Sequence, residues 1–500
     1  MTDSPTYDLL VVGGGVNGAG IAADATARGL KVLLAEKDDL ASATSSASSK
    51  LIHGGIRYLE HYEFRLVRKA LAEREILLHA APHIVWPLRF RLPHLPSLRP
   101  AWMIRIGLFL YDHLARRGTL PGSRSLIFGP DSPLRPEIRR GFEYSDCWVD
   151  DARLVVLNAM AARRQGGDIR TRTLCRAARR EGRLWHARLE NRRTGEEQEV
   201  RARALVNAAG PWVQSFIEGA IGSRSPRHVR LVKGSHIVVP RLYEGEQCYI
   251  LQNDDKRIVF ALPYEERFTL IGTTDRDFSG DPAGVAIDEE ERDYLIAVIA
   301  RYFRHPVAAG DVVWSYSGVR PLLDDDSGDP SAVTRDYRLI RETDDQGRAP
   351  LLSVFGGKIT TYRRLAEEAI DLLAEDFPGL APSPTAHLVL PGGDFAGHDA
   401  LFAELHDRWP WMPGDILARY VRSYGRLAEK LIGTAKSLAD LGANFGAGLL
   451  ESEIRYLMAE EWAETADDIL WRRTKRGLFL DAAKRDRLEG WLAREAVTTP

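Results

Sequence analysis

Near the start of the chain, three glycines and one acidic residue have the spacing of a nucleotide-binding turn. Gly13, Gly15 and Gly18 follow the apolar run 7–12, and an alanine-rich stretch and a second apolar run then lead to Glu36. This order predicts a strand, a turn, a helix and a second strand. Gly13 permits a tight turn, Gly15 lets the backbone approach a diphosphate, and Gly18 allows helix and strand to pack closely. Glu36, 21 residues after Gly15, can accept hydrogen bonds from ribose hydroxyls, so the ADP half of a dinucleotide is expected here rather than an ordinary βαβ turn.

A second glycine turn, Gly356-Gly357, follows the apolar run 351–355 and precedes a predicted helix from about residue 360 to 373. The N-terminus of that helix offers backbone N–H groups to an anionic group. In a flavoprotein it suits the N1–C2=O edge, where negative charge gathers on reduction. Nucleotide-fold segments thus recur near 204–210 and 351–373 with strand-rich sequence between them, which favours FAD over a nicotinamide cofactor held by one contiguous domain.

Several cations stand beside turns or at expected strand ends: Arg57, Arg320, Arg335 and Lys358. Taken singly, each reads more simply as a surface charge. If they converge on one pocket, they suit a phosphate dianion, which arginine binds in bidentate fashion. The hydroxyl-rich segment 42–50 can hydrogen-bond a phosphate or a flavin edge, or it is a solvated loop.

The predicted fold class is α/β, with an FAD-binding Rossmann-like domain of the glutathione-reductase/D-amino-acid-oxidase type, an antiparallel-sheet substrate domain and a C-terminal all-helical cap. A long tail with only helical patterns follows the proline-containing stretch 378–391. The expected boundaries are 1–75, 145–212 and 310–380 for the FAD domain, 76–144 and 213–309 for the substrate and membrane-facing domain, and 390–500 for the cap.

Composition narrows the class of protein. The 500 residues carry a formal net charge of −2, which disfavours a nucleic-acid partner. The three cysteines stand far apart without metal-site or disulfide spacing, which fits a reducing compartment. No signal pattern and no run of about 18 apolar residues are present, so no spanning helix is expected.

The segment 76–111 contains no Asp or Glu. It carries arginines with interleaved aromatic residues, a composition suited to an anionic membrane surface. The alternative is a loop-rich part of the substrate domain that packs inward or contacts an anionic ligand.

The residues resemble the FAD-dependent glycerol-3-phosphate dehydrogenases, most closely the bacterial aerobic, respiratory members, from about residue 8 to 491. The resemblance rests on these segments of the sequence: 13–18 with Glu36, 44–59, 207–212, 233–236, 318–321 and 355–363. Departures are small: Ile56 and Ile359 stand where relatives often have leucine, and Ala209 where many have threonine, which removes one hydroxyl near the cofactor.

The resemblance implies oxidation of sn-glycerol 3-phosphate to dihydroxyacetone phosphate, with FAD taking the hydride and ubiquinone or menaquinone taking the electrons. It further implies a homodimer, cytoplasmic and peripherally bound to the inner membrane. No metal is expected, because the acidic run 324–328 lacks the spacing of a calcium loop.

By position in these motifs, Arg57, Tyr58, Arg335 and Lys358 are assigned to the substrate phosphate. Arg320 is placed near the flavin and the substrate hydroxyl. His236 is the preferred general base and His53 the second choice, since a histidine titrates near neutrality; either can instead be a structural histidine. The residues expected to bind the cofactor are Gly13, Gly14, Gly15, Asn17, Gly18, Glu36, Thr44, Ser45, Ser48, Ser49, Ala209, Gly210, Gly356, Gly357, Lys358 and Thr360.

Three other functions remain open from the sequence: a glycerophosphate oxidase that uses O₂, an amine or amino-acid oxidase of the same superfamily, and a non-enzymatic FAD-binding scaffold.

Overall fold

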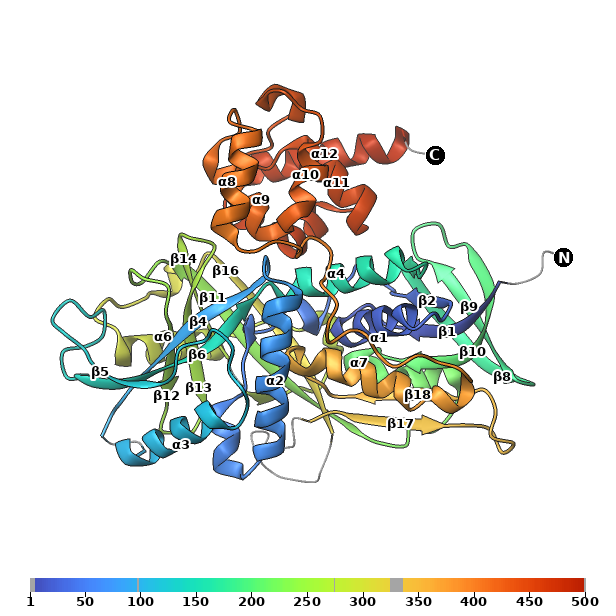
Figure 1. Ribbon diagram of the computed structural model, residues 1–500, viewed down its shortest axis with the longest axis horizontal. Helices are drawn as coiled ribbons and strands as arrows, with labels where there is room; N and C mark the ends of the chain where they lie inside the picture. Colours follow the sequence, from blue (N-terminus) through green and yellow to red (C-terminus); the bar gives the residue numbers. More distant parts are fainter. Residues whose placement is uncertain (1–4, 97–98, 274, 324–335, 499–500) are drawn as a thin grey trace.

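The computed structural model describes residues 5–96, 99–273, 275–323 and 336–498. Two sheets lie side by side, and the C-terminal helices cover them from one end (Figure 1). This arrangement confirms the predicted fold class.

The first sheet contains the opening glycine turn. Within the described residues it has eight strands in the order β17-β18-β10-β1-β2-β7, with β8 and β9 continuing from β10. Its centre, from β18 to β7, is parallel, and α1 packs between α4 and α7 on one face. Parallel strands need both faces covered, which explains their continuous apolar sequence. The bounds are β1 Thr6–Val12, α1 Val16–Ala27, β2 Val32–Ala35, α4 Asp151–Arg164, β7 Asp168–Arg170, β8 Thr173–Glu181, β9 Leu184–Asn191, β10 Glu197–Asn207, β17 Arg338–Glu342, β18 Leu351–Phe355 and α7 Tyr362–Asp371.

The second sheet forms the other wall of the molecule. In the described chain it has ten strands in the order β15-β11-β14-β13-β12-β4-β6-β3, and β16 and β5 pair with β11 and β6. The pairings are antiparallel except for β12 with β4, which is parallel. The bounds are β3 Leu51–Ile52, α2 Phe64–Ala80, β4 Val85–Pro93, α3 Ala101–His113, β5 Arg124–Ile127, β6 Arg140–Val149, α5 Val213–Phe216, β11 Val229–Pro240, β12 Cys248–Gln252, β13 Ile258–Tyr264, β14 Phe268–Gly272, β15 Arg276–Asp277, α6 Glu289–Tyr302 and β16 Trp314–Leu323.

The predicted boundary near residue 310 differs from the strand pairing. β16 lies within the range assigned to the FAD domain, yet it pairs with β11 of the second sheet from Val229↔Leu323 to Val238↔Trp314. The short strand β3 also joins the second sheet. Alternating hydrophobicity identifies a strand but not its partner, which is fixed by contacts distant in sequence.

Within the described residues, the C-terminal part is helical as predicted, with one isolated β-bridge between Asn444 and Leu450. Its apolar side chains share one continuous buried cluster with α1, α4 and α7, so it packs firmly on the first sheet's helical layer. Its helices are α8 His398–Arg408, α9 Gly414–Tyr424, α10 Ala428–Ile432, α11 Glu451–Glu461 and α12 Ala482–Thr498.

Candidate active site

A cavity of about 560 Å³ lies between the two sheets and is lined by residues of both. Most of the predicted site residues line it: Gly13, Gly15, Asn17, Glu36, Thr44, Ser45, Ser48, Ser49, His53, Arg57, Tyr58, Ala209, Gly210, His236, Arg320, Gly356, Gly357, Lys358 and Thr360. Residues separated by more than three hundred positions are thus brought to one site.

The first glycine turn has no room for side chains. A Cβ on Gly13 would lie 2.5 Å from the carbonyl oxygen of Ala208, and Gly13 has a φ of +112°. A Cβ on Gly18 would overlap the carbonyl oxygen of Gly13. Gly14 and Gly18 do not line the cavity, so they shape the turn rather than face a ligand. The close packing leaves the N-terminus of α1 open to a diphosphate.

Glu36 follows the last residue of β2 and lies beside the first glycine turn. Its Oε2 accepts a hydrogen bond from the N–H of Gly14 (2.6 Å), and its Oε1 accepts one from the N–H of Asp38 (2.8 Å). Burial raises the pKa of Glu36, while these two donors oppose that rise. Each carboxylate oxygen retains a second lone pair for a ribose hydroxyl.

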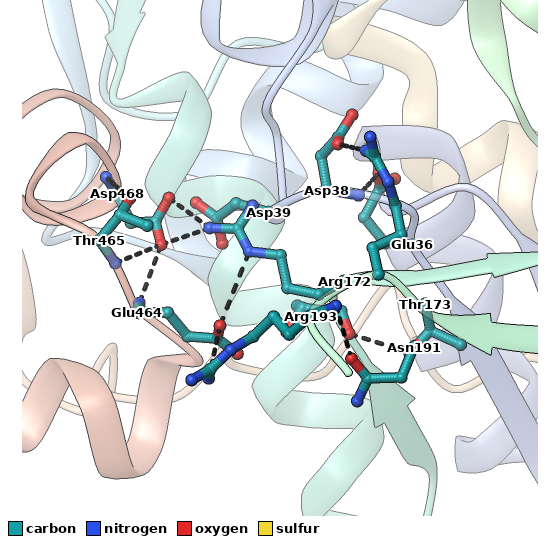
Figure 2. Close-up of polar contacts among 12 residues, drawn as sticks. Glu36, Asp38, Asp39, Arg172, Thr173, Asn191, Arg193, Glu464, Thr465 and Asp468 are labelled. Carbon is teal, nitrogen blue, oxygen red and sulfur yellow. Dashed lines mark hydrogen bonds and ion pairs between the residues drawn. The ribbon is translucent and has the colours of Figure 1, made fainter. Parts of the chain in front are cut away.

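Thr173, Leu174 and Cys175 also line this end of the cavity, and sequence reasoning missed them. The N–H of Thr173 donates to the carbonyl oxygen of Glu36 (2.7 Å), which places the start of β8 beside Glu36 (Figure 2). No motif marks these residues, because only the pairing of β7 with β2 brings them here.

The second glycine turn contacts the first directly. Asn17 donates from Nδ2 to the carbonyl oxygen of Gly356 (3.1 Å), and a Cβ on Gly357 would lie 2.8 Å from that Nδ2. The φ values of Gly356 and Gly357 are +75° and +107°, which favour glycine. Both predicted cofactor turns therefore border one continuous space.

The hydroxyl-rich segment is an ordered wall of the cavity, not a solvated loop. Ser45 Oγ accepts from the N–H of Val16 (2.9 Å), and Thr44 Oγ1 donates to the carbonyl oxygen of Val319 (2.6 Å). These bonds join the start of α1 to β16, the strand that carries Arg320.

Arg320 is oriented by two polar side chains at the end of β14, neither of which sequence reasoning identified. Its Nη1 pairs with Asp275, and its Nη2 donates to Thr273 Oγ1 (2.8 Å). All three residues line the cavity. The guanidinium is therefore held in one orientation.

Arg57, Tyr58 and Lys358 line the cavity, and Lys358 Nζ lies 3.8 Å from the centre of the Tyr58 ring. In the part of the chain that the structure describes, neither Arg57 nor Lys358 pairs with a carboxylate. Unneutralised cations in the lining of a cavity suit an anionic ligand. Arg335 lies outside the described residues, so its predicted role stays a prediction.

His236 is buried between the hydroxyl-rich segment and β16. Its Nε2 shares a hydrogen bond with Ser49 Oγ (2.9 Å), and its ring stacks on Tyr316 at 4.7 Å. Burial, with the charges of Lys50 and Arg320, lowers the pKa of His236 well below its usual value. At neutral pH the ring is uncharged and can accept a proton. His53, less buried, also lines the cavity, and its ring lies 6.1 Å from that of Phe260.

Replacing His236 with asparagine tests whether it is the base. We expect flavin content to be unchanged and substrate oxidation to slow by about a hundredfold or more, the usual contribution of a general base. Because its pKa is low, kcat/KM in the unsubstituted enzyme should not lose activity through His236 protonation between about pH 6 and 8. Steady-state rates of His236→Asn are compared with those of His79→Asn, an exposed histidine on α2. Retention of most of kcat by His236→Asn would reject it as the base.

Among the described residues, no group of three or more His, Cys, Asp or Glu side chains could hold a metal ion. The three cysteines are buried and unbridged. The absence of a metal from the reaction remains a prediction.

Two glycine turns, the acidic residue after the second strand and an enclosed cavity between two sheets define a dinucleotide-binding oxidoreductase. The chain matches the family described as "FAD dependent oxidoreductase" over residues 8–363 and "C-terminal domain of alpha-glycerophosphate oxidase" over residues 383–490. The cofactor is therefore FAD, as predicted.

Relatives identify the family more narrowly. The chain is 59% identical to a glycerol-3-phosphate dehydrogenase of Pseudomonas aeruginosa, covering 99% of this chain and 96% of that protein. It is 56% identical to the aerobic glycerol-3-phosphate dehydrogenase of Escherichia coli, with 97% of each covered, and 54% identical to a D-erythritol 1-phosphate dehydrogenase of Brucella abortus, with 98% of each covered. The glycerol-3-phosphate dehydrogenase of Bacillus halodurans, solved with FAD, aligns with a TM-score of 0.77 at 28% identity, over 98% of this chain and 90% of that one. The chain belongs to the FAD-dependent glycerol-3-phosphate dehydrogenase family, which confirms the resemblance seen in its motifs.

Proposed function

We propose that this enzyme oxidises sn-glycerol 3-phosphate to dihydroxyacetone phosphate and passes the electrons to a membrane quinone. The observation that carries the proposal is the cavity itself, because the two glycine turns and the cations Arg57 and Lys358 all line it. Arg335 is a third predicted phosphate ligand.

The bound FAD supplies the hydride acceptor. The cations hold the phosphate and thereby fix the position of the carbon that loses hydride. Arg320, oriented by Asp275 and Thr273, stabilises the oxygen as its proton leaves. His236 accepts that proton. His53 is the second candidate for this role.

The test is an anaerobic titration with separate additions of glycerol 3-phosphate, D-erythritol 1-phosphate and an amino-acid mixture. We expect glycerol 3-phosphate to bleach the visible flavin band, and a ubiquinone analogue to restore it faster than O₂. Faster bleaching by D-erythritol 1-phosphate would reject the substrate assignment, bleaching by amino acids alone would indicate an amino-acid oxidase, and rapid peroxide production without quinone would indicate an oxidase. No bleaching would support a binding scaffold.

We place the membrane-facing surface at α3 and the start of α2. In the described chain no helix is long and apolar enough to cross a bilayer. Trp102 and Phe109 on α3 are 65% and 59% exposed, and Tyr62 before α2 is 81% exposed. A pocket beside them is lined by Arg68, His113, Arg116 and Arg117, with Asp112 and apolar side chains. Exposed aromatics beside basic side chains suit the interface of an anionic bilayer.

In the folded chain, acidic residues from other segments lie beside the acid-free segment 76–111. Arg89 and Arg91 on β4 both pair with Glu143 of β6, and Arg99 pairs with Glu60. Of the four arginines, Arg105 is the one without a carboxylate partner among the described residues. The membrane proposal therefore rests on the apolar face of α3 more than on the charge of the segment.

The double substitution Trp102→Glu/Phe109→Glu is expected to abolish sedimentation with vesicles that contain an acidic phospholipid. Each change removes apolar area from the interface and adds like charge. The matched control, Leu372→Glu/Leu438→Glu, adds the same charge at exposed apolar positions elsewhere and should sediment as the unsubstituted protein does. Equal sedimentation of the two double variants would contradict this surface. The homodimer, the cytoplasmic face of the inner membrane and the absence of a nucleic-acid partner remain predictions.

A further inference from the structure

The loop that follows β2 lies between the FAD cavity and the C-terminal helices. Glu36, Lys37, Asp38 and Ala41 line the cavity at its ribose end. The N–H of Ala41 donates to the carbonyl oxygen of Gly14 (3.1 Å), so the loop closes back onto the first glycine turn. We call residues 36–41 the ribose loop. Figure 2 shows Asp39 of this loop beside Asp468 in the C-terminal turn that begins near Glu464.

Asp39, within the ribose loop, points away from the cavity lining and is fully buried. Its carboxylate accepts hydrogen bonds from Nη1 and Nη2 of Arg473 (2.8 and 2.7 Å) and from Nε of Arg472 (2.6 Å). Arg473 is also fully buried, and both arginines belong to the C-terminal helical part. The C-terminal part thus supplies the cations that compensate a buried charge in the cofactor site.

Arg172 forms a second tie at the start of β8. Its backbone N–H donates to the carbonyl oxygen of Asp38 (2.8 Å), and its guanidinium contacts both carboxylate oxygens of Asp468 (2.6 and 2.8 Å; Figure 2). Asp468 is itself held by Arg472 and by the N–H groups of Glu464 and Thr465. Arg172 has a φ of +51°, which an L-residue keeps only where its surroundings hold it.

Removing one partner of a buried ion pair leaves an uncompensated charge, and this is strongly destabilising. If Arg473 loses its charge, the buried Asp39 carboxylate keeps only Arg472, which it shares with Asp468, so Asp39 must gain water or move. Asp39 lies one residue from Asp38 and two from Ala41, both of which line the cavity. A movement that relieves Asp39 therefore displaces the groups that face the cofactor.

We propose that Arg473 and Arg172 are positioning residues for FAD: the C-terminal helices hold the ribose loop in its binding conformation through Asp39 and Asp38. Docking of these helices and FAD binding are then coupled, and the coupling is reciprocal. The helical part is a component of the cofactor site although none of its residues lines the cavity. This role in cofactor binding is independent of the identity of the substrate.

The test measures FAD affinity of the deflavinated full-length protein by fluorescence titration, with hydrogen exchange recorded with and without FAD. We expect Arg473→Gln to raise the Kd for FAD by about tenfold or more, within the usual range of coupling between sites. In the unsubstituted protein, FAD should slow exchange in residues 461–475 as well as in the ribose loop. In Arg473→Gln the protection of 461–475 by FAD should be lost, which a merely structural role does not predict.

Arg193→Gln is the matched control. Arg193 pairs with Glu464 (3.0 Å), so it joins the same two parts of the chain, but it is exposed and has no bond to the ribose loop (Figure 2). It should leave the Kd for FAD within about twofold, as exposed pairs contribute little.

If Arg473→Gln does not fold, Arg172→Gln is tested instead, because this variant keeps the backbone N–H of residue 172 and changes a partly exposed side chain. An unchanged Kd in the folded variant, or equal weakening in Arg193→Gln, would overturn the proposal.

Discussion

Replacement of Gly18 by valine is expected to yield a folded protein that does not retain FAD. Its Cβ would occupy the position of the Gly13 carbonyl oxygen, so α1 must move away from β1 or the turn must open. Either change displaces the N–H groups that face the diphosphate. Overpacking typically costs about 1–3 kcal/mol, and the upper end of that range corresponds to weakening of FAD binding by about a hundredfold. The flavin absorbance of the purified protein, relative to its protein absorbance, measures the effect.

Gly219→Ala provides the control for this prediction. A Cβ at Gly219 meets no atom within 4 Å, and its φ lies outside the left-handed region. This variant should carry a full complement of flavin. A stoichiometric flavin content in Gly18→Val, with unchanged thermal stability, would contradict the assigned role of the turn.

Arg320→Gln is expected to keep FAD and to slow its reduction by glycerol 3-phosphate by about a hundredfold to a thousandfold, the usual effect of removing a donor to developing negative charge. Glutamine keeps an N–H donor on a shorter side chain and carries no charge. The change removes the guanidinium contacts with both Asp275 and Thr273. Anaerobic stopped-flow measurement of flavin bleaching separates this step from quinone reduction.

Arg230 offers a matched control because it also pairs with a carboxylate in the second sheet, Asp277 (2.6 and 2.7 Å), but lies outside the cavity. Arg230→Gln should reduce the flavin at the unsubstituted rate. If Arg320→Gln bleaches equally fast, Arg320 does not act on the reacting oxygen.

Local motifs made most of the cofactor site predictable. The two glycine turns, 13–18 and Gly356-Gly357, are recognisable because glycine permits their backbone conformations. Glu36 is recognisable because it follows the first turn at a short, fixed spacing. Nearly all predicted residues line one cavity, because parallel strands end at the same edge of a sheet.

The partners of the charged side chains were harder to predict from the sequence than the positions of the glycine turns. The acid-free segment suggested a basic surface, yet Arg89 and Arg91 share one carboxylate, Glu143 of β6, so their charge is only partly compensated. Thr273, Asp275 and Thr173 were missed because they belong to no motif. Their positions depend on strand pairing between distant segments, which hydrophobic alternation alone does not specify.

By itself, the sequence determined the cofactor class, the family and the two glycine turns, because these depend on local backbone geometry and short-range spacing. Only the tertiary structure decided that β16 belongs to the second sheet, that Arg320 is oriented by Asp275, and that Asp39 of the ribose loop is compensated by Arg472 and Arg473. Those contacts join residues up to 434 positions apart. Such pairs form only when folding brings distant segments together, and that proximity is a property of the packed chain rather than of any segment.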